Sequence, residues 1–256
     1  MQAWSPWHGC HRISPGCLNC YVYRRDEQFG KDAGLVERTA AFDLPLRRDR
    51  QGAYKLRPEG GEVFTCGTSD FFLEEADPWR AEAWRLIRQR PELTFLIPTK
   101  RIHRFRVGLP GDWGEGYENV RIALTCEDQQ RAGERLPVFL RLPIRHRLIL
   151  HEPLLGPVDI APYLAQGGIE AVICGGESGD FARVRPCDFA WVLHARAQCV
   201  RYGVPFRFKQ TGALFRRDGV VYRLDRSHQL SQAARARIDY RPQPVDAGWT
   251  TPNPER

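Results

Sequence analysis

Three cysteines lie close together in the sequence, at Cys10, Cys17 and Cys20, with the spacing C-x6-C-x2-C. Pro15 and Gly16 stand between them, and this pair predicts a loop rather than a helix or a strand. A loop allows the three thiols to converge on one centre. Thiolates are the ligands that zinc and iron–sulfur clusters favour, so the spacing indicates a metal site.

Two kinds of metal site fit three thiols at this spacing. Structural zinc is closed and tetrahedral, so it needs a fourth ligand, and His8 and His11 on either side of Cys10 are the candidates. No second C-x2-C pair occurs in the sequence, which excludes an ordinary zinc ribbon. A [4Fe–4S] cluster takes three thiolates and leaves one iron open for chemistry.

The composition is that of an ordinary globular protein, with 256 residues of which 42% are hydrophobic and 27% are charged. No apolar run approaches the roughly 18–20 residues of a membrane span, and the first residues lack the basic start and apolar segment of a secretory signal. We therefore expect a cytoplasmic protein, with no membrane partner, whose thiols stay reduced. The net charge of +7 favours a nucleic acid or nucleotide partner about as much as a solvated basic surface.

Short apolar runs alternate with amphipathic helical stretches along the chain. One helix is expected to open at Asp77-Pro78, and another to run from Cys187 to Gly203. Nearly continuous hydrophobic runs are typical of parallel strands that are buried on both faces. The alternation predicts an α/β fold, a full or partial TIM-like (β/α) barrel in which the cysteine loop, near the N-terminus of the chain, lies at the carboxyl ends of the strands. The expected strands are residues 63–66, 93–97, 120–125, 147–150, 171–174 and 204–208.

The length suits a single domain, which we expect over residues 1–230. Residues 45–62 contain "RRDRQGAY" and "EGG" and are expected to form an exposed loop. Residues 231–256 are expected to form a C-terminal extension that is partly disordered, because their last part is polar and rich in proline. The other five cysteines are expected to pack in the core, as small buried thiols usually do; they are Cys66, Cys126, Cys174, Cys187 and Cys199.

A polar or ionisable residue follows each of the six expected strands. The carboxyl ends of the strands of a parallel barrel meet at one face, and active sites are built there. We therefore expect an active site at this face, although an ion pair inside the barrel explains Glu152 and Lys209 equally well. Its candidate residues are Ser69, Asp70, Lys100, Arg101, Glu127, Glu152, Gly175, Gly176, Glu177 and Lys209.

Seven stretches of the sequence stand in a characteristic order over roughly residues 4–215: "WSPWHGCHRISPGCLNCY", "TSDFFLEEADPWR", "PTKRIHRF", "CEDQ", "HEPLLGPVDI", "GGESG" and "VPFRFKQTG". In these stretches the chain resembles the phage-type three-Cys-motif proteins, a family of phages and bacteria regarded as similar to radical S-adenosylmethionine (SAM) enzymes. Radical SAM enzymes usually carry C-x3-C-x2-C. The present sequence keeps the final C-x2-C, followed by the aromatic Tyr21, and has six residues in the first interval.

The resemblance implies a [4Fe–4S] cluster on Cys10, Cys17 and Cys20 with one open iron, and implies that His8 and His11 are not essential ligands. SAM would bind beside the cluster, and an external electron donor would reduce it. Cleavage of SAM would give a 5′-deoxyadenosyl radical that takes a hydrogen atom from the substrate, which we expect to be a nucleic acid or nucleotide. The alternative is a zinc-dependent nucleic-acid-binding protein in which His8 or His11 closes the cysteine set.

The resemblance also suggests which residues hold SAM. Radical SAM enzymes bind its amine with a Gly-Gly-Glu stretch after the strand that follows the cluster loop. The positional counterpart here is Ser69-Asp70, which we expect to take the amine, whereas Gly175-Gly176-Glu177 comes after a later strand and is expected to line the pocket. Two further sets of residues have expected roles. Two carboxylates would contact ribose hydroxyls or substrate: Glu127 and Glu152. Three cations would hold the SAM carboxylate or a substrate phosphate: Lys100, Arg101 and Lys209.

Overall fold

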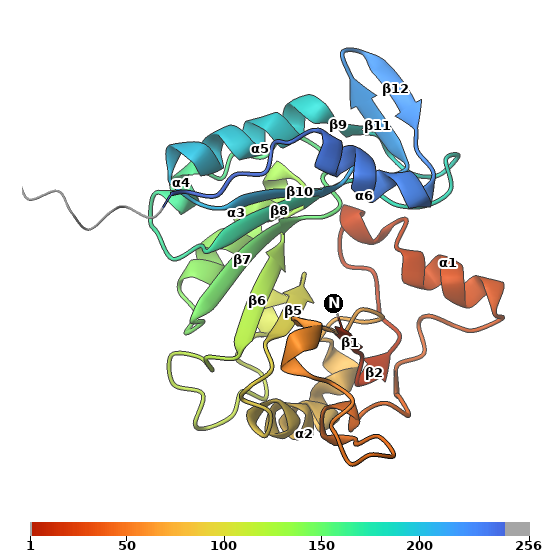
Figure 1. Ribbon diagram of the computed structural model, residues 1–256, viewed down its shortest axis with the longest axis vertical. Coiled ribbons are helices and arrows are strands. Elements are labelled where there is room, and N and C mark those ends of the chain that lie inside the picture. The colour runs from red at the N-terminus through yellow and green to blue at the C-terminus, as the bar shows by residue number, and fades with distance from the viewer. Residues whose placement is uncertain (1, 244–256) are drawn as a thin grey trace, which may run out of the picture.

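A seven-stranded parallel sheet forms the centre of the computed structural model, which describes residues 2–243 (Figure 1). The strand order is β1-β4-β5-β6-β7-β8-β10, so the strands follow one another around the sheet in chain order. Every neighbouring pair is parallel. The sheet is a half-barrel, which confirms the expected α/β class and is compatible with a partial TIM-like barrel. Its strands are β1 (Gln2–Trp4), β4 (Val63–Thr65), β5 (Phe95–Thr99), β6 (Val120–Thr125), β7 (His146–His151), β8 (Ala171–Gly175) and β10 (Phe206–Gln210).

All six expected strands are present, but the first strand of the sheet was not expected. β1 has three residues and only Trp4 of them is fully buried, so it carries no extended apolar run. It pairs with β4 through Ala3 and Phe64. β1 lies at one edge of the half-barrel. The loop with the three cysteines follows it and therefore lies at the carboxyl ends of the strands.

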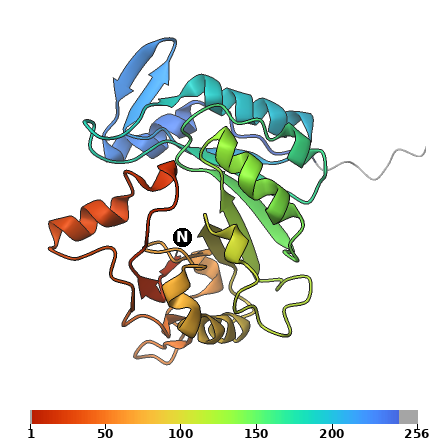
Figure 2. The same ribbon diagram turned by 180° about the vertical axis from the view of Figure 1, so that it is seen from behind.

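Helices cover the outer face of the half-barrel and extend beyond its edges (Figures 1 and 2). The helix expected at Asp77-Pro78 begins there. The helix expected from Cys187 to Gly203 runs from Phe189 to Arg201, and the Asp188 side chain caps its start by accepting a hydrogen bond from the Ala190 N–H at 2.9 Å. The α-helices are α1 (Tyr21–Gln28), α2 (Asp77–Arg88), α3 (Gln129–Leu140), α4 (Ala161–Leu164), α5 (Phe189–Arg201) and α6 (Arg226–Arg235). The 3-10 helices are η1 (Pro15–Cys17), η2 (Leu44–Leu46), η3 (Pro58–Gly60), η4 (Glu74–Ala76) and η5 (Ile102–Arg104).

Two small sheets flank the half-barrel. Cys187 lies in the first of them, in a short strand, instead of in the helix where we expected it. β11 pairs with that strand in parallel and with β12 in an antiparallel hairpin. The strands are β9 (Cys187–Asp188), β11 (Leu214–Arg217) and β12 (Val220–Arg223) in one sheet, and β2 (Trp7–His8) and β3 (Glu37–Arg38) in the other.

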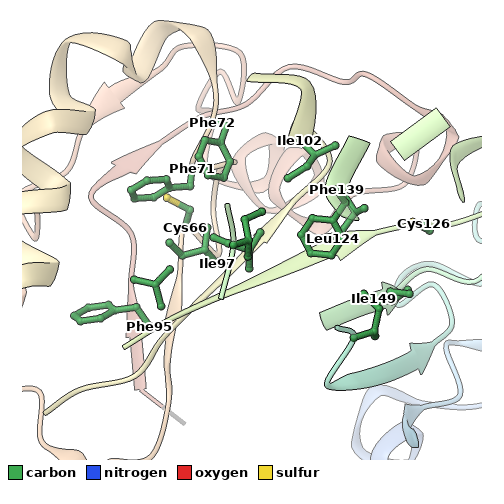
Figure 3. Close-up of a cluster of buried hydrophobic side chains, with 14 of the residues drawn as sticks. Cys66, Phe71, Phe72, Phe95, Ile97, Ile102, Leu124, Cys126, Phe139 and Ile149 are labelled. Carbon is green, nitrogen blue, oxygen red and sulfur yellow. The ribbon is translucent and has the colours of Figure 1, made fainter. Parts of the chain in front are cut away.

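The main hydrophobic core lies between the sheet and the helices, and a smaller cluster lies on the inner face of the half-barrel. Successive strand residues point to opposite faces, so on β7 Ile149 joins the main core while Leu148 and Leu150 join the inner cluster. Figure 3 shows part of the main core, including Cys66 and Cys126. The five cysteines outside the N-terminal loop are all buried in this core, as expected.

Most residues of the segment 45–62 are exposed, as expected, but the segment is also held to the rest of the protein. Arg90 is almost fully buried beneath it and donates hydrogen bonds to the backbone oxygens of Pro45 and Leu56, the latter at 2.8 Å. The same guanidinium stacks on the Tyr54 ring at 3.8 Å from its centroid. The buried arginine thus holds this segment together with Leu56, whose side chain packs in the main core.

Replacement of Arg90 by methionine is expected to release this segment. The backbone oxygens of Pro45 and Leu56 would lose their donors, and the free energy of unfolding is expected to fall by about 3 kcal/mol. Limited proteolysis checks the effect, with faster cleavage within residues 45–62 expected. Arg88→Met is the matched control, because Arg88 is exposed and its ion pair, with Asp112 at 2.8 Å, lies at the surface. Equal cleavage rates in both variants would contradict the assignment.

The expected domain boundary at residue 230 falls inside α6. The chain continues beyond that helix to Tyr240, whose backbone pairs with Phe206 of β10 through hydrogen bonds of 2.8 and 2.9 Å. The last residues of the expected extension, 244–256, lie outside the described part of the chain. No helix among residues 2–243 has the length and apolar character that crossing a membrane needs.

Candidate functional site

A cavity of about 910 Å³ opens at the carboxyl ends of the strands. Its walls come from the cysteine loop, α1, the loops that follow β4, β5, β7 and β8, the end of β10, and the start of α6. The sequence-predicted residues that line it are Cys10, Cys17, Cys20, Ser69, Asp70, Lys100, Arg101, Glu152, Gly176, Glu177 and Lys209. Glu127 and Gly175 do not line it.

The cysteine loop is fixed at both ends. Gly9 has a positive φ of 92°, and a Cβ there would lie 2.2 Å from the Leu35 oxygen, so only glycine fits this turn. The Cys10 N–H donates to the Ala33 oxygen at 2.8 Å. At the other end, α1 begins directly after Cys20. The three thiols therefore sit on ordered backbone at the mouth of the half-barrel.

Burial makes two of these thiols weak acids. It raises the pKa of Cys10 to about 12, with a further increase from Asp70 and an opposing effect from Arg101. Burial also raises the pKa of Cys20, and hydrogen bonds from the backbone N–H groups of Val22 and Tyr23 oppose this increase. Both shifts are opposite in direction to the lowered pKa values that are typical of reactive catalytic cysteines. A bound metal deprotonates a coordinating thiol outright.

Both neighbouring histidines are engaged with carboxylates. His8 Nε2 lies 2.7 Å from Asp26 Oδ2, and His11 Nε2 lies 2.6 Å from Glu75 Oε1. All eight cysteines are free thiols. Across residues 2–243, no three side chains of histidine, cysteine, aspartate or glutamate meet closely enough to hold one metal ion. A cube differs from a single ion, since each thiolate binds a different iron.

Glu127 lies behind the cysteine loop and anchors it. Its Oε1 accepts a hydrogen bond from the Gly16 N–H at 3.3 Å, and its Oε2 accepts one from Arg135 Nη1 at 2.7 Å. The side chain is fully buried. Burial alone would raise its pKa, but the Arg135 guanidinium and the Ser14 hydroxyl outweigh that effect and lower it. The expected contact with ribose or substrate is therefore replaced by a structural contact with the loop.

Asp70 joins the ends of β4 and β5. Its Oδ1 accepts from the Thr99 hydroxyl at 2.8 Å and from the Phe72 N–H at 3.0 Å, and its Oδ2 accepts from the Lys100 N–H at 2.9 Å. The residue is mostly buried but lines the cavity. Oδ2 has only that single donor among residues 2–243 and keeps room for another.

Glu177 connects the cysteine loop to the end of β8. Its Oε2 accepts hydrogen bonds from Asn19 Nδ2 at 3.0 Å and from the backbone N–H and Nε of Arg185 at 2.8 and 3.0 Å. Its Oε1 pairs with the same guanidinium. The carboxylate lines the cavity, but its accepting positions are largely occupied within the protein.

Glu152 and Lys209 form an ion pair on the cavity wall, with 2.8 Å between Lys209 Nζ and Glu152 Oε2. The pair keeps 22% and 36% of its side-chain surfaces exposed, so it is not a closed core contact. Gly175 makes room for it, since a Cβ at that position would lie 3.0 Å from Glu152 Oε1. Lys100, by contrast, faces the cavity with no carboxylate at ion-pair distance within the described residues.

Several residues of the cavity wall were not among the sequence-predicted candidates, including Arg24 on α1, Ser178 after β8 and Arg226 on α6. The "GGESG" motif marked the loop that holds Ser178, but no sequence signal showed that the two helices meet it. Arg24 and Arg226 of these helices donate hydrogen bonds to Ser178 in that loop.

A family model described as "Protein of unknown function (DUF5131)" matches residues 1–239. Comparison with curated proteins and comparison with solved structures each found no match. The matched range contains the whole half-barrel and all the residues that line the cavity.

Proposed function

We propose that this chain, which belongs to the family described as "Protein of unknown function (DUF5131)", is a radical SAM-type enzyme. Cys10, Cys17 and Cys20 would hold a [4Fe–4S] cluster, and SAM would bind in the cavity beside them. One observation carries the proposal: three free thiols on a loop after the first strand of a parallel half-barrel line the same cavity as the polar strand ends.

The residues present fit such a cluster. Three thiols are the protein ligands of a cube with one open iron, and both nearby imidazoles already bond carboxylates through Nε2. Such a cluster, reduced by an external donor, would supply the electron for cleavage of SAM to methionine and a 5′-deoxyadenosyl radical. The expected substrate is a nucleic acid or nucleotide.

The chain's own residues would bind SAM and exclude water from it. Lys100 is free of carboxylate partners in the described chain and suits the SAM carboxylate. Asp70 Oδ2 keeps room to accept a hydrogen bond from the amine. The inner wall beside them is apolar, with Phe64 and Leu150 on it, so it excludes water from the reacting atoms.

Anaerobic reconstitution with iron and sulfide tests this function. We expect about four irons per chain and, after reduction with SAM present, formation of 5′-deoxyadenosine. Air would destroy an open cluster, so the measurement has to stay anaerobic throughout. Stoichiometric zinc bound through three thiols and a histidine, with no deoxyadenosine formed, would instead identify the zinc-dependent nucleic-acid-binding protein.

The Asp70→Asn variant is expected to bind SAM roughly tenfold more weakly and to keep its iron, because a charged acceptor for the amine is lost. Calorimetric titration of the reconstituted protein with SAM measures the affinity. Glu177→Gln is the matched comparison, since its carboxylate is already engaged by Asn19 and Arg185. A loss of affinity for SAM in Glu177→Gln and none in Asp70→Asn would show that Glu177, and not Asp70, binds the amine.

A further inference from the structure

Two arginines from distant parts of the chain meet at one serine of the cavity wall. Arg226 Nη1 donates to Ser178 Oγ at 2.6 Å, and Arg24 Nη1 donates to the Ser178 backbone oxygen at 3.4 Å. Arg24 lies on α1 and Arg226 begins α6, and these helices lie on the same side of the sheet (Figures 1 and 2). All three residues line the cavity.

Neither guanidinium has a carboxylate partner at ion-pair distance within residues 2–243, unlike Lys209 and Arg25 of the same wall. Lys209 pairs with Glu152 at 2.8 Å, and Arg25 lies 3.7 Å from Asp26. Asp180 and Asp225 also line the cavity, but neither forms an ion pair with the two arginines. Two positive charges therefore meet neutral oxygens: the hydroxyl and the carbonyl of Ser178 and, for Arg226, also the side-chain amide oxygen of Gln229 at 3.5 Å.

The loop that holds Ser178 is shaped to admit Arg24. A Cβ at Gly179 would lie 2.3 Å from Arg24 Nη1 and 2.8 Å from Val184 Cγ1, so a side chain there would displace the guanidinium. Two like charges that are held close together repel each other, and an anion bound between them offsets that repulsion. The planar fork of arginine matches the oxygen geometry of phosphate, which it binds through two parallel hydrogen bonds.

We propose that Arg24, Arg226 and Ser178 form a phosphate-binding subsite. The inference rests on the proposed function in taking the cavity as the substrate site, and it narrows the substrate to a molecule with a phosphate group. SAM carries no phosphate, so this subsite belongs to the second molecule in the cavity. A nucleotide and a nucleic-acid strand share this chemistry, and the test separates them.

Calorimetric titration of the full chain in the absence of SAM tests the subsite with three probes: inorganic phosphate, a nucleoside 5′-monophosphate and a short single-stranded oligonucleotide. Arg24→Gln and Arg226→Gln are each expected to weaken binding of the monophosphate roughly tenfold, the effect of losing charge-assisted hydrogen bonds. The unphosphorylated nucleoside should bind wild type and variants alike. The oligonucleotide is expected to bind more tightly than the monophosphate if the substrate is a strand, and more weakly if it is a nucleotide.

Arg235→Gln controls for net charge, because Arg235 is exposed on the same helix and does not line the cavity. Its binding of the monophosphate should equal that of wild type, and thermal melting establishes that all variants are folded. Equal affinity of wild type, Arg24→Gln and Arg226→Gln for the monophosphate would overturn the proposal, as would an equal loss in Arg235→Gln. Loss of phosphate binding in the two variants of a protein that makes no deoxyadenosine would keep the subsite and reject the radical SAM function.

Discussion

Replacing Cys10, Cys17 or Cys20 by alanine is expected to abolish both the iron content and the formation of 5′-deoxyadenosine. A cube with three protein ligands has no spare thiolate, and a cavity-facing iron without its ligand is open to water. All three thiols line one cavity, and the two neighbouring imidazoles are held by carboxylates, so none is positioned as a substitute. Iron and sulfide analysis after anaerobic reconstitution, with a deoxyadenosine assay on the same samples, measures the loss.

Cys187→Ala and Cys199→Ala are the controls for this loss. Both thiols are fully buried in the hydrophobic core and lie outside the cavity. Their removal takes one small group from the core, so these variants should retain iron and activity even where stability falls slightly. Retention of both iron and deoxyadenosine formation by any variant of the three loop cysteines would contradict the cluster assignment. Loss of iron from all five variants alike would point to misfolding instead.

The sequence predicted the sheet well because parallel strands buried on both faces are nearly continuous apolar runs. β1 escaped prediction because three residues are too few to show such a run. The face that holds the site followed from topology, since the carboxyl ends of parallel strands converge whatever the sequence of the loops. That convergence placed Asp70, Lys100 and Glu152 on one cavity wall.

The role of each polar residue was not predictable in the same way. Glu127 and Glu152 both follow strands closely, yet Arg135 from the next helix captures Glu127 behind the loop while Glu152 stays on the cavity wall. Arg24 and Arg226 meet only because α1 and α6 pack beside the same loop. Such pairings depend on tertiary contacts between segments far apart in the chain, which hydrophobic periodicity does not report.

The Glu127→Ala variant is expected to lose roughly 3–5 kcal/mol of unfolding free energy, the usual effect of removing one partner of a buried ion pair. Arg135 would remain buried with an uncompensated charge, and the Gly16 N–H would lose its acceptor. Chemical denaturation of the metal-free protein at neutral pH measures the change. Glu134→Ala on the same stretch of chain is the control, because its pair with Arg131 is exposed and should matter little.

Acid should remove the stability that the negative charge of Glu127 contributes. The folded pKa of Glu127 is lowered, because Arg135 and Ser14 outweigh the effect of burial. A carboxylate whose pKa is lower in the folded than in the unfolded state contributes stability above its unfolded pKa, and that contribution is lost as the pH falls through the folded pKa. The comparison uses Glu127→Gln, which keeps an oxygen for the Gly16 N–H but has no charge for Arg135. Its unfolding free energy should lie below that of wild type at neutral pH and approach it once the pH falls below about 4, the ordinary value for glutamate. A constant difference across that range would show that the charge of Glu127 is not what anchors the cysteine loop.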